Sequence, residues 1–128
     1  MSLSGDIPIS FIPIQKADAA RTFYEDTLGL SFETDNDFAI IFRVGPAPGL
    51  MLRLVRARDF VAASHTVFGW IVENIEESLD ELEGKGVTFL RYGHFEQDKR
   101  GIWEAPDGVR IAWFQDPDGN TLSISQHN

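Results

Sequence analysis

The sequence predicts an α+β fold made of two tandem β-α-β-β-β units, at about residues 7–56 and 65–126, within a single domain spanning residues 1–128. Each half of the chain has the pattern of a strand, an amphipathic helix and three further strands. The stretches "GLSF" and "GVTF", where the helices are expected to end, begin at residues 29 and 86 and are therefore 57 positions apart. A chain of 128 residues is long enough to close one core and too short for two ordinary domains.

The first half begins with an apolar strand candidate, "PISFIPI", at residues 8–14. A helix is expected next, because one set of residues has the spacing of a buried helical face: Ala20, Phe23, Tyr24, Thr27 and Leu28. Gly29 is expected to end this helix. Three strands are then predicted within "SFETDNDFAIIFRV" and "GLMLRLV".

The second half repeats this order. "HTVFGWIV" at residues 65–72 is the strand candidate, and "NIEESLDELEGKG" places Ile75, Leu79 and Leu82 on one helical face. Asn74 and Glu77 have the spacing of a capping box, and Gly84 or Gly86 is expected to end the helix. The three following strands are expected in "VTFLRYGHF", "GVRIAWFQ" and "TLSIS".

The two halves differ by an insertion. The turn glycines that precede the last strands, Gly49 and Gly119, are 70 residues apart, whereas the helix ends are 57 apart. The second half therefore contains about 13 extra residues, which we place within "RYGHFEQDKRGIWEAPDG". Such an insertion forms a long hairpin, a flap over a cleft that carries ligand contacts, or a surface hairpin without a role.

Composition limits the function classes. The 11 basic and 20 acidic residues give a net charge of −9, which disfavours nucleic acid and anionic membranes as partners and favours either a cationic ligand or simple solubility. The absence of cysteine excludes disulfides, cysteine-bound metals and thiol nucleophiles. No apolar run approaches the length of a membrane span, and "MSLSGDIPIS" lacks the features of a signal peptide. We therefore expect a cytoplasmic protein.

Three motifs carry a resemblance to a known family. "TFYEDTLGL", the helix that ends in "GKGVTF", and "WFQDPDGNTLSI" are together similar to the vicinal oxygen chelate superfamily. This group holds glyoxalase I, extradiol dioxygenases, methylmalonyl-CoA epimerase and the bleomycin resistance proteins. The resemblance covers about residues 7 to 126. It implies a mixed sheet in each half, curled into an open cup with the helices outside, a small-molecule ligand on the concave side, and a homodimer.

Strand alternation predicts which side chains face the cup. The apolar faces of the last strand in each half are expected beneath the helices: Leu50, Leu52 and Leu54, and Leu122 and Ile124. The opposite faces carry Met51 and Arg53 in the first half, and Thr121, Ser123 and Ser125 in the second. Arg53 and Ser123 each lie four residues after the turn glycine and should occupy equivalent places.

Metal-dependent members of the family that this chain resembles use His, Gln or Glu on the first and last strands of each unit. Carried over position by position, these places fall at Ile9, Arg53, Val67 and Ser123, none of which is a normal ligand of a divalent metal. His65 has the same strand phase as Val67, but a single imidazole seldom holds a metal. No metal and no cofactor are therefore expected.

Other catalytic arrangements are weak in this sequence. Ser123 could be combined with His65 or His94, but nothing resembles a nucleophile elbow. "GPAPG" is too short and too rich in proline for a phosphate-binding loop. Acid–base chemistry by Glu96 or Glu104 in the insertion stays an open alternative.

The remaining features favour recognition. Phe11 is expected on the floor of the cup, and Gly69 is expected to leave room there. Trp70 is expected beneath a helix, whereas Trp103 lies in the insertion and is a candidate ligand contact. The full set of predicted ligand-binding residues is Phe11, Arg53, His65, Val67, Trp103, Ser123 and Ser125.

The leading hypothesis is a metal-free small-molecule binding protein of the glyoxalase/bleomycin resistance type. In this hypothesis Arg53 pairs with an anionic or carbonyl group of the ligand, Ser123 and Ser125 donate hydrogen bonds, and aromatic side chains stack on its flat part. The alternative is an enzyme of the same superfamily, either a metal-dependent lyase or dioxygenase with displaced ligands or a metal-free acid–base catalyst.

Overall fold

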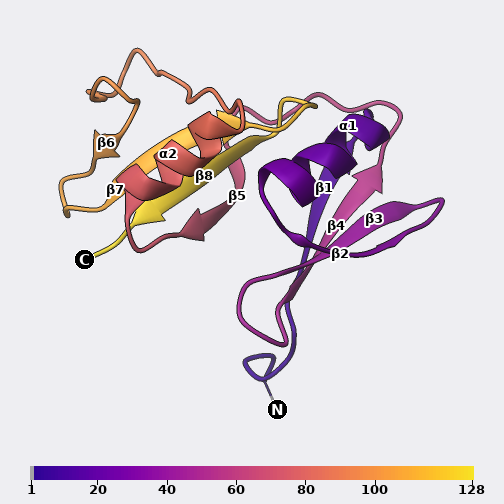
Figure 1. Ribbon diagram of the computed structural model, residues 1–128. Coiled ribbons are helices and arrows are strands. Elements are labelled where there is room, and N and C mark those ends of the chain that lie inside the picture. The colour runs from indigo at the N-terminus through magenta and orange to yellow at the C-terminus, as the bar shows by residue number, and fades with distance from the viewer. Residues whose placement is uncertain (1) are drawn as a thin grey trace. The chain divides into compact units, whose positions relative to one another are not determined.

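The structure is a computed structural model that describes residues 2–128. The chain divides between Val61 and Ala62 into two compact units. Each unit contains one four-stranded mixed sheet and its own helical segment (Figure 1), which confirms the predicted α+β class. Neither helix in residues 2–128 is long and apolar enough to cross a membrane.

The first unit has the predicted order of a strand, a helix and three strands. Its elements are β1 (Ile9–Ile14), α1 (Ala17–Thr22), the π-helical turn η1 (Phe23–Thr27), β2 (Ser31–Asp35), β3 (Ala39–Val44) and β4 (Leu50–Arg56). The strand order is β1-β4-β3-β2, with β1 parallel to β4 and the other pairs antiparallel. Strands β1 and β2 therefore form the two edges of this sheet.

The helical segment covers one face of this sheet. Ala20 and Tyr24 are fully buried, and the Tyr24 ring lies 6.1 Å from the ring of Phe42 on β3. Gly29 follows with a φ of 71°, a conformation that favours glycine, and the helical segment ends there as predicted. Leu52 and Leu54 are fully buried on the covered face, again as alternation predicts.

The second unit repeats this arrangement. Its elements are β5 (Thr66–Ile71), α2 (Ile75–Gly84), β6 (Trp103–Glu104), β7 (Arg110–Gln115) and β8 (Thr121–Gln126). The strand order is β5-β8-β7-β6, with β5 parallel to β8. The sheet of each unit thus has one covered face and one face opposite its helix, which we call the helix-free face.

The start of α2 is fixed by side chains. Asn74 Oδ1 accepts a hydrogen bond of 3.1 Å from the backbone N–H of Glu77, which confirms the predicted cap. The N–H of Ile75 donates to Gln126 Oε1 on β8 at 2.9 Å. Ile75 and Leu79 are fully buried, so the apolar stripe of the helix lies on the sheet as its spacing predicts.

The prediction of a strand in "VTFLRYGHF" is wrong. Residues 87–102 contain no named strand, and the first strand after α2 is β6, which has only two residues. Leu90 makes a single backbone hydrogen bond of 2.7 Å to the carbonyl of Trp113 on β7. Beyond it the chain turns away from the edge of β7, and a side chain supplies the hydrogen bonds that a neighbouring strand would otherwise make.

Candidate functional site: an aromatic pocket in the second unit

A pocket of about 300 Å³ lies within the second unit. It is lined by Ser64, His65, Thr66, Tyr92, His94, Phe95 and Trp113, which we call the aromatic pocket. None of these residues is Asp, Glu, Lys or Arg. The pocket therefore offers three aromatic rings, two imidazoles and two hydroxyls to a ligand, the mixture of apolar surface and few polar groups that small-molecule sites use.

Three parts of the chain supply this lining. Trp113 lies on β7 opposite Ser123 of β8, so both side chains are on the helix-free face. Ser64 and His65 lead into β5, and Thr66 is its first residue. The third part is residues 87–102, which we call the covering segment. Near its start Phe89 packs against Phe114 on the covered face, with 5.7 Å between ring centroids, and further on Phe95 stacks on Trp113 of the helix-free face.

The rings of the pocket have a defined geometry. Phe95 is nearly parallel to Trp113, with an interplanar angle of 5° and 5.3 Å between centroids, and it also stacks on Trp103 at 4.4 Å. The ring centroids of Trp103 and Trp113 are 6.3 Å apart, and Phe95 stacks on both rings. Tyr92 meets Trp113 at 81° and 5.2 Å. The pocket wall therefore combines parallel and perpendicular rings, both of which are favourable aromatic contacts.

Gln97 holds the covering segment in this shape. Its side-chain Nε2 donates to the carbonyls of Leu90 and Gly101, at 2.8 and 2.7 Å, and its Oε1 accepts from the N–H of Tyr92 at 2.6 Å. One half-buried amide therefore satisfies three backbone groups that have no strand partner. These bonds fix the backbone of Tyr92 and, through it, the position of its ring.

The charged side chains of this unit pair elsewhere. Arg110 of β7 donates two hydrogen bonds to Glu76 in the first turn of α2. These bonds hold the pKa of Glu76 below its ordinary value and raise the pKa of Arg110. Arg100 of the covering segment donates to Glu83 and Asp80 of α2, which raises the pKa of Arg100. Both pairs join α2 to other parts of the unit.

The structure brings some of the predicted site residues of this unit together. His65 lines the aromatic pocket, and Trp103 lies on the same helix-free face but is covered by Phe95 and does not line the pocket. Ser123 and Ser125 are half-buried on that face, and the hydroxyl of Ser125 is 3.0 Å from Nε2 of His127. Thr121, expected beside these serines, is buried.

The register of β5 differs from the simplest alternation. Ser123 pairs with Gly69, whereas Val67 lies at an irregularity between the paired residues Thr66 and Phe68. A Cβ atom added to Gly69 would lie 2.8 Å from the carbonyl oxygen of Ser123 and closer still to its hydroxyl. Gly69 is thus required by the approach of Ser123, and the room it leaves is already filled by that side chain.

The other two predicted site residues, Phe11 and Arg53, lie in the first unit. They pair with each other across β1 and β4, so both are on the helix-free face of that sheet. Phe11 is 61% exposed, and Arg53 is half-buried. Within residues 2–128 the Arg53 side chain makes no hydrogen bond or ion pair. It is therefore available to a ligand or to another chain.

Sequence reasoning missed most of the aromatic pocket. The sequence places Tyr92, His94 and Phe95 in a predicted strand and gives Trp113 no role. A signal was present in "RYGHF", where three ring-bearing residues fall within the insertion. The pattern does not show that the chain passes from one face of the sheet to the other at Leu90.

The donor chemistry does not fit the metal site that the family resemblance implies. Ser123 is flanked by Gly69 and Trp113, and Arg53 by Phe11 and Ile41, so these places offer no set of metal ligands. In the part of the chain that the structure describes, no three His, Asp or Glu side chains form a group that could hold an ion.

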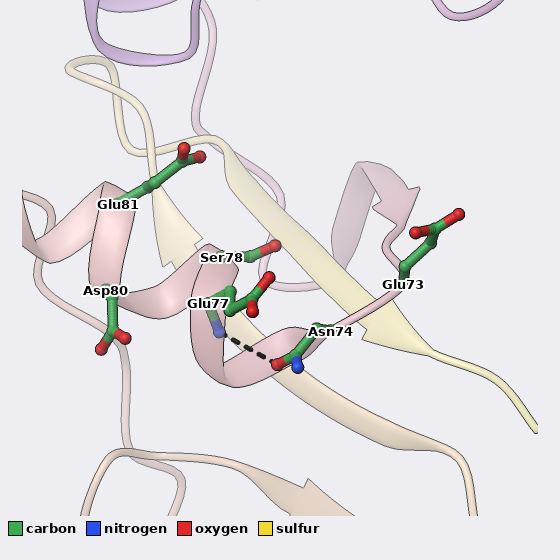
Figure 2. Close-up of a pocket in the computed structure, with 6 residues that line it drawn as sticks. All are labelled: Glu73, Asn74, Glu77, Ser78, Asp80 and Glu81. Carbon is green, nitrogen blue, oxygen red and sulfur yellow. Dashed lines mark hydrogen bonds between the residues drawn. The ribbon is translucent and has the colours of Figure 1, made fainter.

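A second pocket, of about 460 Å³, lies along α2 and is lined by Glu73, Asn74, Glu77, Ser78, Asp80 and Glu81. Figure 2 shows its acidic side chains pointing in different directions rather than toward one point, and Asp80 is bonded to Arg100. We therefore treat it as a solvated helix surface.

The chain was compared with family models and with curated proteins. Residues 9–124 match the family model described as Glyoxalase/Bleomycin resistance protein/Dioxygenase superfamily. No curated protein gave a match.

Solved structures share the fold along the whole chain. A member of the same superfamily from Sphaerobacter thermophilus DSM 20745 has a TM-score of 0.74 at 23% identity, covering 98% of this chain and 100% of the other. Lactoylglutathione lyase from Agrobacterium tumefaciens has a TM-score of 0.71 at 18% identity, covering 98% and 96%. Oxidase ChaP-H2 has a TM-score of 0.65 at 21% identity, covering 98% and 95%. At these identities the likeness concerns the fold alone.

Proposed function

The chain belongs to the Glyoxalase/Bleomycin resistance protein/Dioxygenase superfamily, and from this premise we propose that it is a metal-free protein that binds a small molecule in the aromatic pocket. The observation that carries the proposal is the pocket itself, in which Tyr92, Phe95 and Trp113 lie beside two imidazoles and the hydroxyls of Ser64 and Thr66. The lack of a converging ligand set among residues 2–128 supports the metal-free part of the proposal.

The ligand contacts follow from the lining. A flat group of the ligand stacks on the rings of Tyr92, Phe95 and Trp113. His65 and His94 accept or donate hydrogen bonds at its rim, because an imidazole can do either. This differs from the sequence-based hypothesis, in which Ser123 and Ser125 contact the ligand directly; these serines lie on the same helix-free face, outside the pocket lining.

Arg53 has a separate role in the proposal. A half-buried guanidinium without a protein partner is a strong donor for a carboxylate, a phosphate or a carbonyl group. We assign to it an anionic or carbonyl-bearing group bound on the helix-free face of the first unit.

A second candidate function is acid–base catalysis without a metal. Two imidazoles, His65 and His94, line one pocket, and histidine is the side chain best suited to proton transfer near neutral pH. The names of the lyase and the oxidase with similar folds are compatible with this candidate and do not distinguish it. It predicts that a bound compound is chemically changed, and that His94→Asn abolishes the change while leaving binding within about threefold.

We further propose that the protein acts as a homodimer in the cytoplasm, without nucleic-acid or membrane partners. The exposed apolar side chains of β1, Ile9 and Phe11, support an interface between chains, since the outer edge of that strand is unpaired. The absence of cysteine and the net charge of −9 support the other parts.

The proposal is tested by a thermal-shift screen of small molecules with EDTA present throughout. Compounds that bind should raise the melting temperature of the wild-type protein and not that of Tyr92→Leu. Phe38→Leu is the matched control, because Phe38 is 75% exposed and lies in the first unit. Anionic compounds that bind at Arg53 should lose their effect in Arg53→Ala and keep it in Arg58→Ala, a control at an exposed arginine of the same unit. The screen is repeated without EDTA and with added divalent metal, and stabilisation that appears only in that repeat would contradict the metal-free assignment. Equal stabilisation of Tyr92→Leu would contradict the site.

A further inference from the structure

We propose that the group of the ligand held in the aromatic pocket carries a positive charge, as a quaternary ammonium or a protonated amine does. This inference rests on the proposed function and names the chemical class of the bound group. It concerns only the second unit, and it is independent of what Arg53 contacts in the first.

The first observation is the distribution of charge between the units. Residues 62–128 contain 5 basic and 12 acidic side chains, a formal charge of −7, whereas residues 1–61 contain 6 basic and 8 acidic ones, a charge of −2. Most of the net charge of the chain therefore belongs to the unit that contains the pocket, and not to the unit that contains Arg53. Such a field raises the local concentration of cations and lowers that of anions.

The second observation is that the three arginines of this unit are hydrogen-bonded to groups outside the pocket lining. Arg100 and Arg110 are bonded to carboxylates of α2, and Arg91 donates to the backbone carbonyls of Asp98 and Lys99. No lysine or arginine lines the pocket. An anionic ligand would therefore find no lysine or arginine donor in the lining.

The third observation is the arrangement of the rings. Tyr92 lies at 81° to Trp113 and at 86° to Phe95, while Phe95 and Trp113 are parallel within 5°. Rings that meet at right angles can direct more than one electron-rich surface at one small group. Aromatic rings that line one pocket bind quaternary ammonium groups through cation–π attraction, in which tryptophan is the strongest partner.

A fourth observation concerns the nearest free carboxylate in the sequence. Glu96 follows Phe95 directly, is exposed, and makes no hydrogen bond or ion pair within residues 2–128. Its charge is therefore not neutralised by a protein cation. It lies on the same covering segment as three lining residues and adds to the negative potential at the rim.

The test compares three probes that each contain a phenyl ring and differ in charge. They are benzyltrimethylammonium, its neutral carbon isostere neopentylbenzene, and the anion phenylacetate. Each is titrated into ¹⁵N-labelled full-length protein at low ionic strength, and the indole N–H signal of Trp113 reports occupancy of the pocket. We expect the cation to bind about tenfold more tightly than the isostere, and the anion to bind more weakly than either.

Variants separate the sources of this preference. Tyr92→Leu should reduce the advantage of the cation over the isostere, whereas Phe38→Leu should leave it unchanged. Glu96→Gln should weaken binding of the cation and leave binding of the neutral isostere unchanged, and Asp37→Asn in the first unit is its matched control. Added salt should weaken binding of the cation and not that of the isostere.

The outcomes are distinguishable. If the neutral isostere binds as tightly as the cation and Tyr92→Leu weakens both, the pocket is a binding site but the inferred charge is wrong. Tighter binding of phenylacetate would also overturn the inference. If none of the probes shifts the Trp113 signal up to millimolar concentration, both the inference and the proposed site fail.

Discussion

At Gly69, β5 lies so close to β8 that a residue with a side chain would not fit without a shift. The hydroxyl and carbonyl of Ser123 fill the space that a Cβ atom would need. Gly69 therefore sets the spacing between β5 and β8 on the helix-free face, beside Trp113, and so contributes to the shape of the surface around the pocket.

We predict that Gly69→Ala lowers the free energy of unfolding by about 1–3 kcal/mol, because the backbone must shift to relieve the overlap. Denaturant unfolding measures the change. Gly84→Ala is the matched control, since nothing lies within 4 Å of a Cβ at the end of α2, and it should be neutral or stabilising. Adding Ser123→Ala to Gly69→Ala should recover only part of the loss, because the carbonyl oxygen remains. An unchanged stability of Gly69→Ala would contradict the close approach.

Single residues also show where sequence reasoning succeeds. Leu52, Leu54, Leu122 and Ile124 are buried as strand alternation predicts, because a regular strand has a period of two. In β5, Val67 lies at an irregularity between Thr66 and Phe68, and the residue that pairs with Ser123 is Gly69. An irregularity that adds one residue to a strand leaves no mark in the period, so this shift could not be predicted.

At the scale of elements, the covering segment is the part of the second unit that has no counterpart in the first. Apart from one isolated β-bridge between Gln97 and Trp103, it keeps its shape through turns and side-chain hydrogen bonds, and Gln97 makes three of the side-chain bonds. The position of the pocket rings therefore depends on one amide.

We predict that Gln97→Glu loosens this segment, although the two side chains have the same shape. The carboxylate loses both donors that face the carbonyls of Leu90 and Gly101, and an unmet buried hydrogen bond costs about 1–3 kcal/mol. Hydrogen exchange should show reduced protection of the amide of Tyr92, and ligand stabilisation should decrease. Gln115→Glu, an exposed change on β7, is the control. Unaltered exchange at Tyr92 would rule out this role of Gln97.

A second element contact, between α2 and β7, is predicted to depend on pH. The pKa of Glu76 is lowered by Arg110 in the folded protein, so the pair stabilises the fold above the ordinary pKa of a glutamate, about 4.3, and the stabilisation is lost as the pH falls through the lower folded value. Exposed pairs contribute roughly 0.2–1 kcal/mol. Glu76→Gln should therefore lower stability slightly at neutral pH and converge with wild type in acid. Unfolding curves between about pH 3 and pH 7 measure this, with Glu77→Gln as a control that has no ion pair. A difference that grows in acid would contradict the sign.

The elements were predicted unequally well for a physical reason. A strand or helix with one buried face shows a regular spacing of apolar residues in the sequence. This spacing predicts the order of a strand, a helix and three strands in both units. The covering segment packs through isolated ring contacts on two faces, and no period describes such a path. Phe89 and Phe95 of this segment contact opposite faces of the same sheet.

At the scale of the whole molecule, the chain carries two unlike helix-free faces. One presents an unbonded Arg53 beside exposed Phe11, and the other presents the aromatic pocket in the more acidic unit. Within residues 2–128, β1 pairs only with β4, so its outer edge has no strand partner.

We predict that the protein is a homodimer that uses the β1 edge. Light scattering after gel filtration should give about twice the chain mass of 14.4 kDa, and Phe11→Asp should shift the mass toward that of one chain. Phe38→Asp is the matched control, because Phe38 is also exposed but lies between β2 and β3. A monomeric wild-type protein would contradict the prediction.

The central claim is that this superfamily member binds a small molecule in the aromatic pocket without a metal. The most direct test is native mass spectrometry of the wild-type and Tyr92→Leu proteins, purified without chelator and mixed with a small-molecule extract of the source cells. The account predicts an added organic mass at one per chain on the wild-type protein, no stoichiometric metal, and loss of the added mass in Tyr92→Leu. A bound Fe, Mn, Ni or Zn ion at about one per chain, or an organic mass that Tyr92→Leu retains, would contradict it.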